Sequence, residues 1–138
     1  MPRVLLFGTF DFLHIGHIHA MQEARRLGNE LIIVVGRDAA VQKLKKRKPI
    51  HTEQERKAMV EALSIPECVV LGDTVLGAYR VIGKYKPNII AIGYDQDALA
   101  KDLARFLKQK KNPPKLVRLR AYKPHARASR RFKQAFSL

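Results

Sequence analysis

The chain has 138 residues, one cysteine and no apolar run near the ~20 residues that a membrane-spanning helix needs, so it excludes an intrachain disulfide and a helical membrane protein. Its formal net charge is +15, and residues 103–138 hold 12 of the 27 Lys and Arg and no acidic residue. Such a field attracts polyanions, either nucleotides or nucleic acid. The length predicts one domain over residues 1–138. The N-terminus shows no leader pattern, so we expect a cytoplasmic protein with no membrane partner.

Short apolar runs alternate with segments of helical pattern along the chain. Strands are predicted at residues 4–7, 30–36, 67–71, 88–92 and 116–119. Helices are predicted at residues 15–27, 38–44, 53–63, 75–85, 97–110 and 129–136, with Thr52 and Glu55 forming a capping box and Ser129 capping the last. This alternation predicts an α/β fold in three layers with a five-stranded, mainly parallel sheet. A ligand is then expected outside the carboxyl ends of the strands.

One segment joins the first strand to the first helix and reads Gly-Thr-Phe-Asp-Phe-Leu-His-Ile-Gly-His over residues 8–17. His14 and His17 lie at the predicted helix start, where unpaired N–H groups and the macrodipole attract phosphate. Two imidazoles there can donate hydrogen bonds to phosphoryl oxygens. Gly8 and Gly16 allow the backbone to approach a ligand closely. The motif therefore predicts a phosphate site, in which Asp11 either fixes the turn or binds a metal indirectly.

This segment resembles the signature of the cytidylyltransferase-like nucleotidyltransferase superfamily. The resemblance implies a Rossmann-like sheet with strand order 3-2-1-4-5. It also implies transfer of a nucleotidyl group from a nucleoside triphosphate to a phosphorylated acceptor, with release of pyrophosphate. Mg²⁺ or another divalent metal is expected to accompany the triphosphate. The reaction depends on alignment and charge stabilisation, since a phosphate acceptor is already ionised and needs no general base.

The resemblance assigns roles to individual residues. The expected catalytic residues are His14 and His17, with Lys43 or Lys46 from the basic loop. The expected nucleotide-binding residues are Gly8, Thr9, Phe10, Asp11, Gly16, Gly93, Tyr94, Asp95, Gln96, Ser129 and Arg130. The expected acceptor-binding residues are Arg37, Asp38 and Arg56.

Two stretches depart from the superfamily pattern. Many cytidylyltransferases carry Arg-Tyr-Val-Asp before the third strand, where this chain has Ser64-Ile65-Pro66-Glu67. The missing arginine counts against a glycerol-3-phosphate or choline-phosphate cytidylyltransferase. At the last helix, Ala128-Ser129-Arg130-Arg131 replaces a Ser/Thr pair, so arginine forks would supply the phosphate contacts that hydroxyl groups make elsewhere.

The turn Gly93-Tyr94-Asp95-Gln96 and residues 48–63 resemble archaeal-type FAD synthases, which transfer AMP from ATP to FMN. ATP and FMN are therefore the expected substrates. Transfer of a cytidylyl or adenylyl group to glycerol 3-phosphate, a sugar phosphate or phosphopantetheine stays open. An RNA-binding protein is the remote alternative, because the basic residues 103–138 include the aromatic residues Phe106, Tyr122, Phe132 and Phe136. The aromatic pattern of known RNA-binding motifs is missing, however. The identity of the metal and the formation of a homodimer are left open.

Overall fold

The computed structural model describes residues 2–122 of the chain. Its strands are β1 (Arg3–Gly8), β2 (Glu30–Val35), β3 (Cys68–Leu71), β4 (Ile89–Ile92) and β5 (Lys115–Arg118). Its helices are α1 (Ile15–Arg25), α2 (Asp38–Lys45), α3 (Glu53–Ala62), α4 (Arg80–Tyr85) and α5 (Asp97–Leu107). The strands form one parallel sheet with the order β3-β2-β1-β4-β5. The predicted α/β class and strand order are confirmed.

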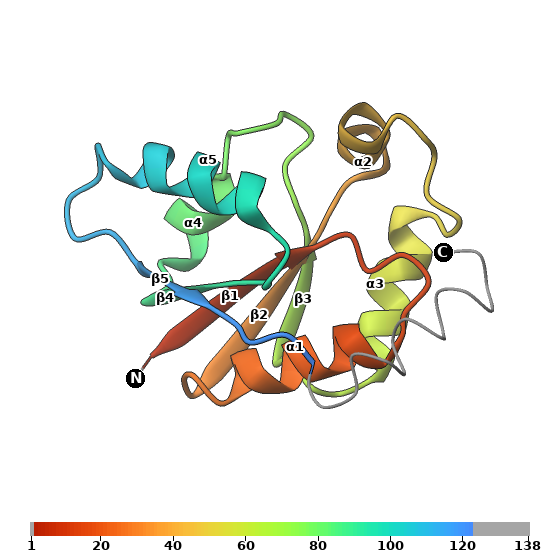
Figure 1. Cartoon of the computed structure of the whole chain (residues 1–138), viewed down its shortest axis with the longest axis horizontal. Coiled ribbons are helices and arrows are strands. Elements are labelled where there is room, and N and C mark those ends of the chain that lie inside the picture. The colour runs from red at the N-terminus through yellow and green to blue at the C-terminus, as the bar shows by residue number, and fades with distance from the viewer. Residues whose placement is uncertain (1, 123–138) are drawn as a thin grey trace.

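The central strands are apolar on both faces because helices cover both faces of the sheet. Successive side chains of β1 alternate between two buried clusters, so that Val4 joins one and Leu5 the other. The first cluster includes Met21 of α1 and Val60 of α3, and the second includes Leu103 of α5. Figure 1 shows the resulting layers, with α1 and α3 on one side of the sheet and α4 and α5 on the other. Within residues 2–122 no helix has both the length and the apolar character to cross a membrane.

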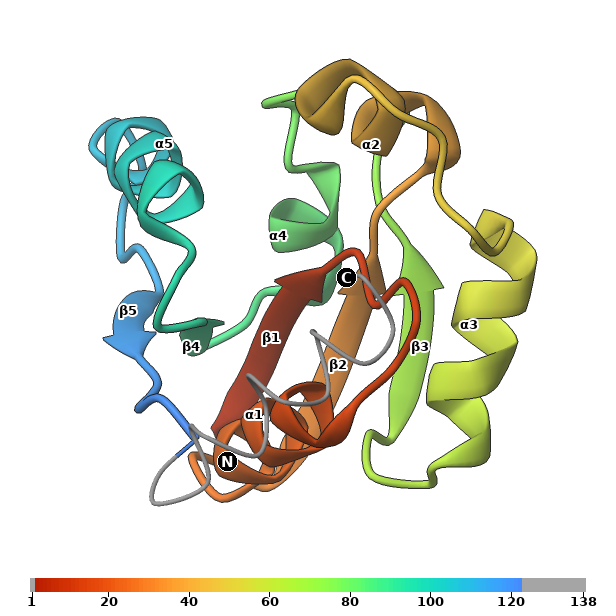
Figure 2. The same ribbon diagram turned by 45° about the vertical axis from the view of Figure 1, so that its right-hand side comes forward.

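The order in which the chain adds strands to the parallel sheet reverses at β1, which has β2 on one side and β4 on the other. The chain runs outward from β1 to β2 and β3, then crosses back and places β4 on the other side of β1. The carboxyl ends of strands at such a reversal form a crevice in which ligands bind. Figure 2 shows α2 beyond the end of β2, and the segment after β3 rising beside α2 before it turns back into α4.

The helix predicted over residues 75–85 is wrong over its first half, since α4 begins only at Arg80. Gly77 and Tyr79 have φ angles of +78° and +45°, which a right-handed helix does not allow. Residues 72–79 therefore form an irregular segment at the carboxyl edge of the sheet. The other predicted elements are present, although α5 ends at Leu107 rather than at residue 110. The helix predicted over residues 129–136 lies outside the described residues.

Candidate active site

The two motif histidines form one rigid pair at the start of α1. His14 is the N-cap, and its Nδ1 accepts a hydrogen bond of 3.0 Å from the Gly16 N–H. His17 Nδ1 accepts one of 3.3 Å from the His14 N–H, so the two side chains close a reciprocal capping box. The rings stack with centroids 4.0 Å apart. A neutral imidazole whose Nδ1 accepts carries its proton on Nε2. Both Nε2 atoms are thereby donors beside a helix N-terminus whose first turn contains no acidic residue.

The loop before the histidines is anchored in the core. Phe10 has a positive φ of 55°, and its side chain is buried in the cluster beneath α1. A Cβ at Gly8 would lie 2.5 Å from the Phe10 ring, so only glycine fits at position 8. The predicted role of Phe10 in nucleotide binding can therefore involve its backbone alone. Gly8 and Thr9 instead line a cavity on the other side of β1.

Asp11 fixes a distant loop. Its Oδ2 accepts a hydrogen bond of 2.8 Å from the Ile50 N–H, and its Oδ1 accepts one of 3.0 Å from the His51 N–H. Of the two roles that the sequence left open, this geometry matches the structural one. The anchored backbone, however, lies about 40 residues away rather than in the local turn. Asp11 thus connects the loop between β1 and α1 (residues 9–14, the histidine loop) to the start of α3.

The acceptor role expected for Arg56 stays a prediction, and the structure gives its side chain a set of protein partners instead. The side chain is fully buried, and its guanidinium is committed to protein groups. Nε donates to the His51 carbonyl (3.1 Å), Nη1 to the Thr9 carbonyl (2.7 Å) and Nη2 to Asp38 Oδ1 (2.7 Å). Asp38 also accepts from the Glu53 N–H at 3.2 Å. The predicted acceptor residues Arg56 and Asp38 are therefore the brace that joins the histidine loop, α2 and α3.

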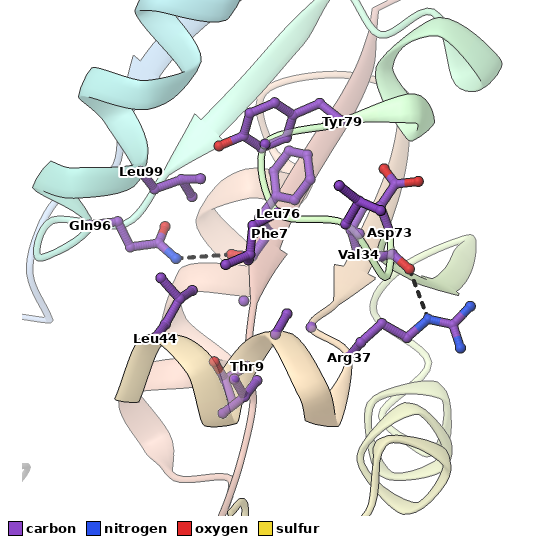
Figure 3. A pocket seen from close by; sticks show the side chains of 17 residues that line it. Phe7, Thr9, Val34, Arg37, Leu44, Asp73, Leu76, Tyr79, Gln96 and Leu99 are labelled. Atoms are coloured by element: carbon purple, nitrogen blue, oxygen red, sulfur yellow. Dashed lines mark hydrogen bonds between the residues drawn. The ribbon is translucent and has the colours of Figure 1, made fainter. Parts of the chain in front are cut away.

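A cavity of about 250 Å³ opens at the carboxyl ends of β1, β2 and β3. Figure 3 shows its walls, with Thr9 at one end, Tyr79 at the other, and Gln96 and Arg37 on opposite sides. The lining is mainly apolar, and its aliphatic and aromatic members are Phe7, Val34, Ala40, Val41, Leu44, Val75, Leu76, Tyr79 and Leu99. The catalytic candidates His14 and His17 do not line it. The site therefore has two parts, the histidine pair at the start of α1 and an apolar cavity, and Gly8 and Thr9 of the cavity lining precede the histidines in the chain.

Gln96 closes the crevice between β1 and β4. Its Oε1 accepts a hydrogen bond of 2.7 Å from the Gly93 N–H, and its Nε2 donates one of 3.1 Å to the Phe7 carbonyl. The second of these bonds is visible in Figure 3. A Cβ at Gly93 would lie only 3.0 Å from Gln96 Oε1, so a larger residue would crowd this side chain. Arg118 holds the same turn from β5, with Nη1 2.9 Å from Asp97 Oδ1 and 3.3 Å from the Gly93 carbonyl.

Several predicted residues lie apart from the cavity. Lys43, Lys46, Tyr94 and Asp95 are exposed on the surface and do not line it. Arg37 does line it, and donates from Nε to the Gly72 carbonyl (2.9 Å) and from Nη1 to Glu53 Oε2 (3.0 Å). Ser129 and Arg130 lie outside the described residues. The roles of these residues stay predictions.

No group of three or more His, Cys, Asp or Glu within residues 2–122 could hold a metal ion. Asp11, the metal candidate from the sequence, already accepts two backbone hydrogen bonds. Asp73 at the edge of the cavity accepts one of 2.7 Å from the Arg80 N–H. The described side chains therefore do not form a metal site of their own.

Sequence reasoning missed two features that shape the site. One is Tyr79, which lay inside the predicted helix over residues 75–85. The interruption of that short pattern by Gly77 was the signal for an irregular segment. The other is the aliphatic rim of Leu44, Val75 and Leu76, which are exposed although large and apolar. Neither feature follows a period that a sequence pattern detects.

Comparison with known proteins agrees with this geometry. The model of the family described as "Cytidylyltransferase-like" matches residues 5–131. FAD synthase from Aciduliprofundum boonei is 41% identical over 88% of this chain and 80% of its own length. FAD synthase from Thermococcus sibiricus is 37% identical over 85% and 79%. A solved lipopolysaccharide core biosynthesis protein from Thermoplasma volcanium superposes with a TM-score of 0.79 at 35% identity, over 89% of this chain and 99% of that one.

Strand order, the histidine pair at the start of α1 and this match over most of the chain agree with one another. The chain belongs to the cytidylyltransferase-like family of nucleotidyltransferases, and it is similar over most of its length to FAD synthases.

Proposed function

We propose that this enzyme transfers AMP from ATP to FMN, giving FAD and pyrophosphate. The observation that carries the proposal is the pair of Nε2 donors that the capping box of α1 aligns, in a chain about 40% identical to FAD synthases. A phosphate oxygen of FMN attacks the α-phosphorus of ATP and forms the new P–O–P bond. The bond from the α-phosphorus to the oxygen that bridges to the β-phosphate breaks, and pyrophosphate leaves with the electron pair.

The residues at α1 stabilise charge in this step rather than move a proton. His14 and His17 donate to phosphoryl oxygens, and the helix N-terminus adds its positive end. Such preorganised donors act on charge that grows on the equatorial and leaving oxygens. Lys43 or Lys46, which are both exposed on α2 and at its C-terminal end, adds a further positive charge. We propose that Mg²⁺ or another divalent ion enters with the triphosphate, because Mg²⁺ is commonly held by substrate phosphates together with one or two carboxylates.

The cavity favours FMN over smaller acceptors. Leu44 is 70% exposed, and Val75 and Leu76 are exposed beside it, so three large aliphatic side chains surround one opening. Apolar surface gathered at a cavity marks a place where an apolar ligand or partner binds. Glycerol 3-phosphate and simple sugar phosphates offer no apolar surface to cover these side chains. The flat ring of FMN does, which supports it as the acceptor.

The direct test is pyrophosphate release from ATP or CTP with Mg²⁺ and a panel of phosphate acceptors. We expect turnover with ATP and FMN, and little with CTP or with glycerol 3-phosphate. A thermal shift assay without acceptor gives a second measure, since a ligand that binds only the folded protein raises Tm according to its affinity. A larger shift with CTP than with ATP, or turnover that prefers a sugar phosphate, would move the enzyme to a different reaction of the same family. The cytoplasmic location and a homodimer stay predictions.

A further inference from the structure

Two aromatic rings form a corner at the end of the cavity away from Thr9. Phe7 on β1 and Tyr79 before α4 lie edge to face, with ring centroids 5.8 Å apart and planes at 78°. Both line the cavity (Figure 3). Behind Tyr79, the ring of Phe106 on α5 lies 5.1 Å away at 67°. The corner is therefore supported from the side that faces away from the cavity.

Tyr79 is held in this place against its backbone preference. Its φ and ψ of 45° and 42° are left-handed, a conformation that a bulky residue seldom adopts. Such a conformation persists where the surroundings determine it, and it gathers at ligand sites. Here the Tyr79 hydroxyl donates a hydrogen bond to Asp102 on α5. Burial and the Asp102 carboxylate both raise the pKa of Tyr79, so the hydroxyl stays a donor at neutral pH.

Tyr79 also lies between two cavities. A second cavity of about 300 Å³ lies between α5 and residues 77–79, and Gly77 and Tyr79 line both cavities. Asp102, Arg105 and Lys110 line that second cavity, so it is more polar than the first.

We propose that Phe7 and Tyr79 form the binding site for the acceptor's flat aromatic ring, and that Asp102 fixes the position of Tyr79. The inference rests on the proposed function, in which the acceptor is FMN. The first cavity is smaller than the ~300–1,000 Å³ pockets that enclose whole drug-sized ligands. It therefore takes the ring, while the ribityl phosphate extends past Thr9 toward the histidines. Aromatic rings favour edge-to-face and offset contacts of the kind that Phe7 and Tyr79 already make.

The test uses the light emission of FMN, because a tyrosine in contact with an excited flavin quenches its fluorescence and a phenylalanine does so much less. The full chain is titrated with FMN in the presence of an ATP analogue in which a methylene group replaces the oxygen between the α- and β-phosphorus, and calorimetry measures the Kd separately. We expect wild type to quench bound FMN. Tyr79→Phe should restore most of the emission and raise the Kd for FMN by about fivefold, through loss of the bond to Asp102. The KM for ATP should not change. Tyr85→Phe, on α4, is the matched control and should behave as wild type.

Bound FMN that emits equally in wild type and Tyr79→Phe would overturn the proposal that the ring binds at Tyr79. A measurement on the wild-type protein covers the case in which Tyr79→Phe does not fold. Riboflavin, which has the ring without the phosphate, should displace FMN more strongly than glycerol 3-phosphate, which has the phosphate without the ring. Stronger displacement by glycerol 3-phosphate than by riboflavin would overturn the proposed ring-binding site as well. Failure of the proposed function has a different signature, which is wild type that releases no pyrophosphate from ATP with FMN.

Discussion

Arg56 and Asp38 form an ion pair of 2.7 Å in which the arginine side chain is 0% exposed and the aspartate side chain 41% exposed. The buried partner is the cation, and its other nitrogens donate to the Thr9 and His51 carbonyls. Three segments that carry the site are thus tied to one guanidinium, which a lysine could not reproduce because it lacks the planar fork.

Arg56→Ala should lower the free energy of unfolding by about 3 kcal/mol or more, because it leaves two carbonyls and a carboxylate without their donor. Urea denaturation measures this as a lower midpoint. Arg47→Ala is the control, since Arg47 is exposed on the basic loop and its loss should change stability by no more than ~0.5 kcal/mol. A stable Arg56→Ala protein with only a raised KM for FMN would instead support the acceptor role predicted from the sequence.

His14→Ala should lose both a helix cap and a catalytic donor. We expect a loss of about 1 kcal/mol in stability from the cap, and a fall in kcat of about 10²–10³ from the donor. His14→Asn separates the two, because asparagine is a good N-cap residue but does not place a donor where Nε2 lies. It should keep wild-type stability and remain nearly inactive in the pyrophosphate assay. His17→Ala should show a similar fall in kcat. Near-normal turnover in any of these variants would remove that histidine from the reaction.

The two candidate lysines can be separated through their backbone positions. Lys46 is the C-cap of α2 with φ 55°, a left-handed position that glycine adopts without strain. Lys46→Gly should raise stability by about 0.5–1 kcal/mol. If Lys46 is the lysine that contacts phosphate, the same variant should lower kcat/KM about tenfold or more. Lys43→Ala tests the other candidate. Unchanged kinetics in both would place the basic loop outside the active site.

The capping box of α3 predicts a pH dependence. Hydrogen bonds from Thr52, through its backbone N–H and its hydroxyl group, lower the pKa of Glu55 below its ordinary value of 4.5. Because the folded pKa is the lower one, the charged form stabilises the fold above pH 4.5, and this contribution disappears as the pH falls through the folded pKa. Glu55→Gln should therefore be less stable than wild type at pH 7, and the gap should narrow as the pH falls below 4.5. Urea midpoints of both proteins across this range measure the gap. A constant gap would show that the Glu55 charge contributes nothing.

The fold could be predicted because its signals are local. Apolar strands and helical periods give an α/β sheet, and the capping box at Thr52 is confirmed with both of its hydrogen bonds. The histidine pair was also readable, since His-x-Gly-His at a helix start is a contiguous pattern. The strand order came from the family resemblance and is confirmed.

The rest of the site depends on contacts across long stretches of chain, which no local pattern encodes. The sequence predicts Arg56 as an arginine that binds the acceptor. Its hydrogen bonds to Thr9 and Asp38, which lie 47 and 18 positions earlier in the chain, show that it joins separate segments of the protein. Asp11 accepts hydrogen bonds from backbone N–H groups that lie about 40 residues later in the chain. Tyr79 acquires its place from Asp102, 23 residues later, which overrides the weak helical pattern around it.

The burial of Phe10 beneath Gly8 has a consequence for how the enzyme moves. Loops that carry catalytic groups commonly open at a small free-energy cost, independently of the rest of the protein. This one is different, because Phe10 within it is a member of the buried core cluster beneath α1. To release the loop, Phe10 would have to leave that core, so amide protons near the start of α1 should exchange with solvent only in the rare event that unfolds the whole sheet. The two motif histidines therefore stay in one place while substrates enter and leave.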